Sequence, residues 1–185
     1  MIFLIFDTAL NEQYTLIQLQ QKYPMHTSLF QGTKDEALFD IAPYVFEIDA
    51  QLFEKVNGPL IKLHEMVYIE TDENMKDTID HFQLFIYKLI NNKEYFFRFW
   101  DARVLPKYLH ECNEDQLNTF FGNVKAFYIE DKNGTSFQKF EKGRKNKLLN
   151  IEVQKKIVFD TIEIPKTSEV VSETDQPKKR RFFVE

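Results

Sequence analysis

The sequence contains little cysteine and little glycine, and it has no long apolar run. Its one cysteine, Cys112, excludes an internal disulfide framework. Its 5 glycines do not form the glycine-rich loop that cradles a nucleotide phosphate. No apolar stretch approaches the ~20 residues that span a bilayer, and the apolar start, residues 2–6, is too short for a signal peptide. We therefore expect a soluble, cytoplasmic protein with no membrane partner.

The residues that are present suit one globular domain with an aromatic core. Hydrophobic residues make up 43% of the 185 residues, and the chain holds 19 phenylalanines. The net charge is −5, but residues 1–140 carry 13 basic and 21 acidic residues, whereas residues 141–185 carry 11 basic and 8 acidic residues. An acidic body with a basic end is not typical of a nucleic-acid-binding domain, so we expect no nucleic acid partner.

Short apolar runs alternate with segments of helical period. This alternation predicts an α/β fold in which helices flank a mostly parallel central sheet. The predicted strands are residues 1–6, 27–30, 44–48, 66–70, 95–100 and 124–129. The clearest helix has a cap at Asp72 or Asn74 and one apolar face, formed by Met75, Ile79, Phe82, Ile86 and Leu89.

The C-terminal third predicts shorter elements and a tail. Two short helices are expected after residue 104, the second between Asn113 and Gly122. An antiparallel hairpin is expected to turn at residues 131–134, and residues 148–164 are expected to add a strand or a short helix. The domain is predicted to span residues 1–165, and residues 166–185 to form a flexible basic-aromatic tail.

The most informative segment is Arg98-Phe99-Trp100-Asp101-Ala102-Arg103-Val104-Leu105, because it places three charges inside an aromatic run. On a strand, Arg98 would lie between Phe96 and Trp100, and a buried guanidinium requires a carboxylate or carbonyl partner. Asp101 would end the strand and cap the next helix. An alternative is that the arginines bind an oxyanion. We favour an internal clamp, because no phosphate cradle and no nucleophile with a base lies nearby.

Two other patterns carry less information. His110 and Cys112 are two residues apart on a predicted helix, which points their side chains in different directions, so we expect no metal and no cofactor. The basic run at residues 178–181 precedes Phe182, Phe183 and Val184. This combination suits short-motif recognition of a protein partner, although a solvated tail or weak binding to an anionic surface would give the same pattern.

The charged segment is similar to the signature of a bacterial family, long called a domain of unknown function, whose members act as adaptor chaperones of the type VI secretion system. Seven of its eight positions match, and Ala102 stands where the family has proline. The resemblance extends over about residues 1–131, where three earlier segments and one later segment agree in order and spacing. These are Leu4–Ala9, Ser28–Thr33, Leu38–Val45 and Phe120–Val124, with Asn123 in place of another proline.

The resemblance implies a non-catalytic cytoplasmic adaptor. Such a protein would bind the N-terminal region of one cognate secreted effector together with the C-terminal end of the VgrG spike protein, and would release the effector before secretion. We interpret Arg98, Trp100, Asp101 and Arg103 as the structural signature, and we assign partner contacts to Arg103, Phe182 and Phe183.

Two other classes of protein stay open. A small intracellular enzyme would bind an anionic ligand through Arg98 and Arg103, in a pocket where both guanidiniums reach solvent. An immunity protein would bind the active domain of a toxin rather than its N-terminal region.

Overall fold

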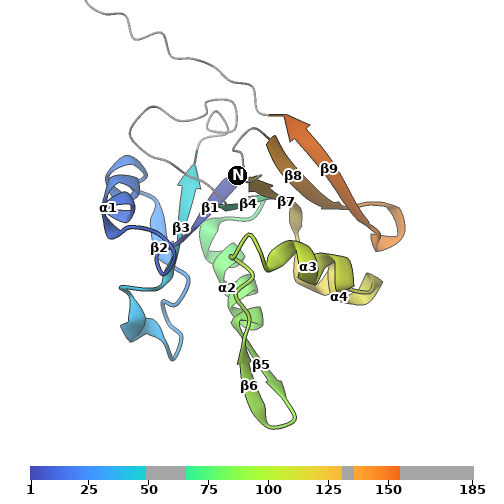
Figure 1. The fold of residues 1–185 in the computed structure, drawn as a ribbon, viewed down its shortest axis with the longest axis horizontal. Helices are drawn as coiled ribbons and strands as arrows, with labels where there is room; N and C mark the ends of the chain where they lie inside the picture. The colour runs from blue at the N-terminus through green and yellow to red at the C-terminus, as the bar shows by residue number, and fades with distance from the viewer. Residues whose placement is uncertain (49–65, 131–135, 155–185) are drawn as a thin grey trace, which may run out of the picture.

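The computed structural model describes residues 1–48, 66–130 and 136–154 (Figure 1). These residues form a seven-stranded sheet in the order β2-β3-β1-β4-β7-β8-β9, and a separate β5-β6 hairpin. The strands of the sheet are β1 (Ile2–Asp7), β2 (His26–Ser28), β3 (Pro43–Ile48), β4 (Val67–Thr71), β7 (Val124–Glu130), β8 (Ser136–Lys142) and β9 (Leu148–Gln154). The helices are α1 (Gln13–Lys22), α2 (Met75–Ile86), α3 (Leu105–Glu111) and α4 (Glu114–Phe121), with short 3₁₀ turns η1 (Glu36–Leu38) and η3 (Arg144–Asn146).

The prediction of a mostly parallel sheet is wrong, because every neighbouring pair of strands in the described sheet is antiparallel. β1 and β2, joined through α1, do run in the same direction, since both pair antiparallel with β3. However, β3 lies between them. Between β4 and β7 the chain passes through α2, the hairpin, α3 and α4, and it returns in the opposite direction. Alternating strands and helices therefore did not determine the direction of pairing.

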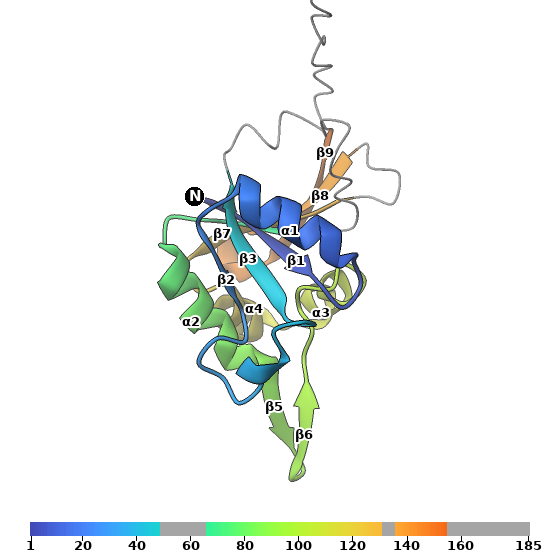
Figure 2. The ribbon, with the colours of Figure 1, turned by 90° about the vertical axis from the view of Figure 1, so that its left-hand side faces the viewer.

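The sheet separates two apolar clusters, because successive side chains of a strand point to opposite faces. Phe3 and Ile5 of β1 lie in the cluster covered by α2, α3 and α4, whereas Leu4 and Phe6 lie in the cluster covered by α1. In Figure 1, β1 and β3 stand between α1 and α2, and in Figure 2 α1 lies across the front of β1 and β3. The larger cluster is rich in phenylalanine, as the composition predicts. Its fully buried rings include Phe82, Phe99, Phe120, Phe127 and Phe140.

Most of the predicted helix boundaries are confirmed. The side chain of Asn74 accepts a hydrogen bond from the backbone N–H of Asp77 at 2.9 Å and so caps α2. Asn113 and Gln116 form a capping box at the start of α4, and Gly122 follows its last residue. Among the described residues, no helix is long and apolar enough to cross a membrane.

Two local predictions are wrong. Leu89 does not extend the buried face of α2, because the helix ends at Ile86 and the chain continues as β5 (Tyr87–Ile90). Residues 95–100 do not form one strand, because β6 (Lys93–Phe96) ends at Phe96. The chain then turns, with the N–H of Asp101 donating to the carbonyl of Arg98 at 3.1 Å.

The predicted turn at 131–134 and the tail from residue 166 lie outside the described residues.

Candidate functional site

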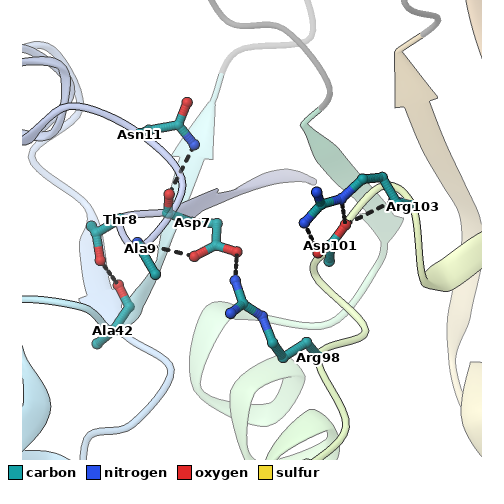
Figure 3. A network of polar contacts seen from close by, with 8 residues as sticks. All are labelled: Asp7, Thr8, Ala9, Asn11, Ala42, Arg98, Asp101 and Arg103. Carbon is teal, nitrogen blue, oxygen red and sulfur yellow. Dashed lines mark hydrogen bonds and ion pairs between the residues drawn. The ribbon is translucent and has the colours of Figure 1, made fainter.

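The signature lies in the connection between β6 and α3, where the chain crosses the ends of β1 and β3. Arg98 makes an ion pair with the buried carboxylate of Asp7, the last residue of β1 (Figure 3). The predicted carboxylate partner of Arg98 is therefore present, although it lies 91 residues away in the sequence. The prediction that Arg98 lies on a strand between Phe96 and Trp100 is wrong, because β6 ends at Phe96, two residues before Arg98.

Asp7 also organises the start of the loop that follows β1. Its Oδ1 accepts a hydrogen bond from the N–H of Ala9 at 3.1 Å, and its backbone carbonyl accepts one from Asn11 at 2.8 Å. The hydroxyl of Thr8 donates to the carbonyl of Ala42 at 2.6 Å, just before β3 (Figure 3). These bonds connect the β1–α1 loop to the residues just before β3. The ion pair between Asp7 and Arg98 connects this loop to the signature.

Asp101 and Arg103 form a second ion pair next to the first. The carboxylate of Asp101 accepts hydrogen bonds from the backbone N–H, the Nε and an Nη of Arg103, at 2.9, 2.9 and 2.6 Å (Figure 3). Hydrogen bonding to Arg103 lowers the pKa of Asp101, and burial of the carboxylate opposes this shift. The prediction that Asp101 caps α3 is wrong, because Val104 holds the cap position and Asp101 instead closes the preceding turn.

The side chain of Trp100 is buried among aromatic rings. Its ring meets Phe30 and Phe96 edge to face, with centroid distances of 6.0 and 5.6 Å. The indole Nε1 of Trp100 and the Nε of Arg98 are buried and have no hydrogen-bond partner among the described residues. A hollow of about 70 Å³, lined by Trp100, Asp7 and Asp101 among others, has room for ordered water.

The signature and the three earlier segments that carry the family resemblance meet at this point. Asp7 and Thr8 come from the first segment, Phe30 from the second, Ala42 from the third, and Arg98 with Trp100 from the signature. These contacts explain why residues so far apart in the sequence form one pattern. Arg98 and Trp100 of the signature contact the end of β1 and the loop after β2, and Thr8 links the same site to the residue before β3.

Neither of the two hollows that described residues form beside the signature is lined by both arginines, as an anion-binding enzyme would need. Arg103 lines the 70 Å³ hollow, whereas Arg98 does not. A second, open hollow of about 400 Å³ lies beside α3 and is lined by Asp101, Arg103, Val104, Lys107, Tyr108 and Glu111. The side chain of Arg103 is 62% exposed and that of Arg98 is 35% exposed. Arg103 is therefore the signature residue that faces solvent.

The other sequence-predicted residues do not add to this site. The ring of His110 contacts Phe140 edge to face at 5.9 Å, and Cys112 is partly buried, which raises the pKa of its thiol. Among the described residues, no group of three or more His, Cys, Asp or Glu side chains is placed to hold a metal ion. Phe182 and Phe183 lie outside the described residues. Sequence reasoning missed Asp7, because no short-range spacing relates it to the signature.

Comparison with known families gives one match. A family described as a domain of unknown function, DUF4123, matches residues 2–119, and the chain belongs to this family. The family is associated with effector adaptors of the type VI secretion system. No curated protein and no solved structure matches the chain. The matched range contains the first three segments of the resemblance and the signature, whereas Phe120–Val124 lies just beyond it.

Proposed function

We propose that the chain is a non-catalytic adaptor chaperone that binds a secreted effector and promotes its loading onto the VgrG spike protein of the type VI secretion system. The observation that carries this proposal is the DUF4123 match over residues 2–119. The adaptor would act in the cytoplasm, before secretion. It would hold the N-terminal region of its cognate effector and the C-terminal end of the spike protein.

The geometry of the signature supports an adaptor better than an enzyme. Arg98 is bound by Asp7, and Arg103 is bound by Asp101, so each guanidinium already has a carboxylate within the fold. An anionic substrate would have to displace one of these carboxylates. The residues Asp7 and Asp101 are both buried, which makes it costly to leave either one without its cation.

A co-purification experiment tests the proposal. The full chain, carrying an affinity tag, is expressed in the cells that encode it, and the bound proteins are identified by mass spectrometry. The adaptor role predicts one dominant secreted effector and the spike protein. A second tagged cytoplasmic protein of similar size serves as the control. Recovery of neither partner would contradict the proposal.

Binding to parts of the effector separates an adaptor from an immunity protein. The adaptor is expected to bind the N-terminal region of the effector when that region is produced alone. Binding confined to the toxic domain would instead support an immunity protein. Deletion of the gene for the adaptor should also remove the effector from the culture supernatant, while its level inside the cell is measured as a control.

A further inference from the structure

The β5-β6 hairpin extends away from the sheet and helices as an exposed arm (Figures 1 and 2). Its two-residue turn, Asn91–Asn92, has both residues at positive φ, which is the geometry of a tight hairpin. A two-stranded hairpin is marginally stable alone in water, so it depends on contacts at its base. Leu89 is 73% exposed, although its spacing from α2 predicts a buried position.

The base of the arm is held firmly. The N–H of Phe97 donates to the carbonyl of Ile86 at 2.8 Å, and the hydroxyl of Tyr87 donates to Asp35 at 2.6 Å. Phe96 packs against Phe30 and Trp100. The arm is therefore fixed in direction by the same aromatic cluster that surrounds the signature.

The two faces of the arm have different surroundings. Tyr87 and Glu94 lie on the face that contacts the loop before β3, where Glu94 makes an ion pair with Lys34. The other face carries Lys88, Lys93 and Tyr95, since Lys88 and Tyr95 are directly opposite each other in the ladder. Tyr95 is 50% exposed, and Lys93 is exposed. This second face is both aromatic and basic.

This face continues onto α3. The ammonium of Lys88 lies over the ring of Tyr108, 5.0 Å from its centroid. Tyr108 lines the open hollow of about 400 Å³, together with Arg103 and Lys107. We call the continuous surface the arm strip. It is formed by Lys88, Lys93, Tyr95, Arg103, Lys107 and Tyr108.

The strip is positive on a chain whose first 140 residues are strongly acidic. Within the described residues, neither Lys93 nor Lys107 has an ion-pair partner. Asp101 and Glu111 are the carboxylates beside α3, and Asp101 is already bonded to Arg103. The exposed ring of Tyr95 and the partly exposed ring of Tyr108, next to Lys93 and Lys107, suit a segment that carries both apolar side chains and carboxylates.

We propose that the arm strip binds an acidic segment of the secreted effector, with apolar side chains of that segment packed against Tyr95 and Tyr108. This inference rests on the proposed adaptor function, and it adds the surface and the chemistry of the bound segment. Lys93 and Lys107 would pair with carboxylates of the effector, which favours fast association and correct orientation.

Charge reversal at two exposed lysines tests the strip. The purified full chain with Lys93→Glu and Lys107→Glu is titrated with the effector identified by co-purification. The dissociation constant is expected to rise at least about tenfold at low salt, and the difference should shrink at high salt. The matched control is Lys145→Glu with Lys147→Glu, which makes the same charge change at exposed residues of the β8–β9 turn. The control is expected to bind like the wild type.

A photo-crosslinking residue in place of Tyr95 locates the bound segment, and one in place of Tyr14 on α1 serves as its control. The crosslink at position 95 should fall in an effector segment that contains carboxylates and apolar residues. Replacing those carboxylates by lysine should restore binding to the charge-reversed protein.

The possible failures are distinguishable. If the wild type binds the effector and the charge-reversed variant binds equally well, the strip is not the binding surface, although the adaptor function stands. If the wild type binds no effector, the proposed function fails. If charge reversal instead dissociates a dimer of the chain, measured by light scattering, a second copy occupies the strip and the inference is overturned.

Discussion

At the scale of single residues, the signature is explained by two ion pairs that hold connections rather than by a reactive group. Asp7 and Asp101 have nearly buried side chains, whereas their arginine partners reach solvent to different extents. A buried carboxylate is tolerated only when a cation or hydrogen-bond donors satisfy it. The charges in this aromatic segment are thus all paired: Arg98 with Asp7 of β1, and Arg103 with Asp101 of the segment itself.

The Arg98→Ala substitution should lower the free energy of unfolding by about 2 kcal/mol, because it leaves the buried Asp7 carboxylate without its cation and the guanidinium is partly screened by solvent. Chemical denaturation measures the loss. The control is Lys76→Ala, which removes the exposed, solvent-screened pair between Lys76 and Asp80 and should leave the free energy of unfolding almost unchanged. A variant that unfolds like the wild type but no longer binds its partner would place Arg98 on a binding surface instead.

Stability should depend on pH through Asp101, whose pKa is lowered in the fold chiefly by hydrogen bonding to Arg103. A lowered pKa means that the folded state favours the ionised carboxylate. The carboxylate therefore contributes fully to the free energy of unfolding above the pKa of about 3.9 that it has in the unfolded chain. This contribution is lost as the pH falls through its lower pKa in the folded state. The difference in unfolding free energy between the wild type and Asp101→Asn should be about 1.5–3 kcal/mol at pH 6 and should shrink below pH 4. A difference that does not change with pH would contradict this role.

At the scale of elements, α4 and β7 are joined by a turn that only glycine fits. Gly122 has a φ of +52°, and a Cβ there would lie 2.7 Å from Cε1 of His81, whose Nε2 hydrogen-bonds with the carbonyl of Phe120 at 2.9 Å. The close approach of α2 to the end of α4 therefore requires both the backbone freedom and the small size of glycine.

The Gly122→Ala substitution should destabilise the fold by about 1–3 kcal/mol. Gly32→Ala is a matched control, because Gly32 also has a positive φ, +76°, but no atom lies within 4 Å of its Cβ position. Gly32→Ala should therefore show only the free-energy cost of placing alanine at a positive φ. In a His81→Ala background the cost of Gly122→Ala should fall toward that of Gly32→Ala. Equal costs at both glycines in the wild-type background would show that the contact with His81 is unimportant.

Element prediction from the sequence succeeded where the apolar pattern is local. α2, α4 and most strands of the sheet follow from short periodicities and capping residues such as Asn74 and Asn113. The first helix, α1, was missed because it has only a weak apolar face, with Leu16 and Leu19 buried. The hairpin was missed because Leu89 continues the helical spacing of α2 while lying in a strand.

Two features could not be predicted: the direction of strand pairing and the carboxylate that pairs with Arg98. The physical reason is the same for both. Both depend on contacts between residues far apart in the chain, and a local pattern is compatible with more than one such arrangement. The sequence did indicate that Arg98 needs a carboxylate. It contained nothing to distinguish Asp7 from the other acidic residues, because that choice is made by how β1 and the signature meet.

At the scale of the whole molecule, the folded unit is larger than the family match. The match ends at residue 119, within α4, whereas β7 pairs with β4 in the middle of the sheet. Phe120, Phe127 and Phe140 belong to the larger apolar cluster. The segment beyond the match therefore completes the core rather than forming a separate appendage.

A chain that ends at residue 119 should not fold cooperatively. It would lose the three phenylalanines named above together with Phe121, each contributing roughly 2–3 kcal/mol by burial, which is comparable in sum to the ~5–15 kcal/mol that stabilises a typical domain. Thermal unfolding followed by circular dichroism measures this. The control ends at Pro165, the predicted end of the domain, and should melt within a few degrees of the full chain. A cooperative transition in the shorter chain would show that the family match is a complete folding unit.

The most direct test of the central claim is the binding of the purified full chain to the separately purified N-terminal region of its cognate effector, measured by isothermal titration calorimetry. The adaptor account predicts a saturable one-to-one complex with that region and none with the toxic domain alone. Binding to the toxic domain without binding to the N-terminal region would contradict the account.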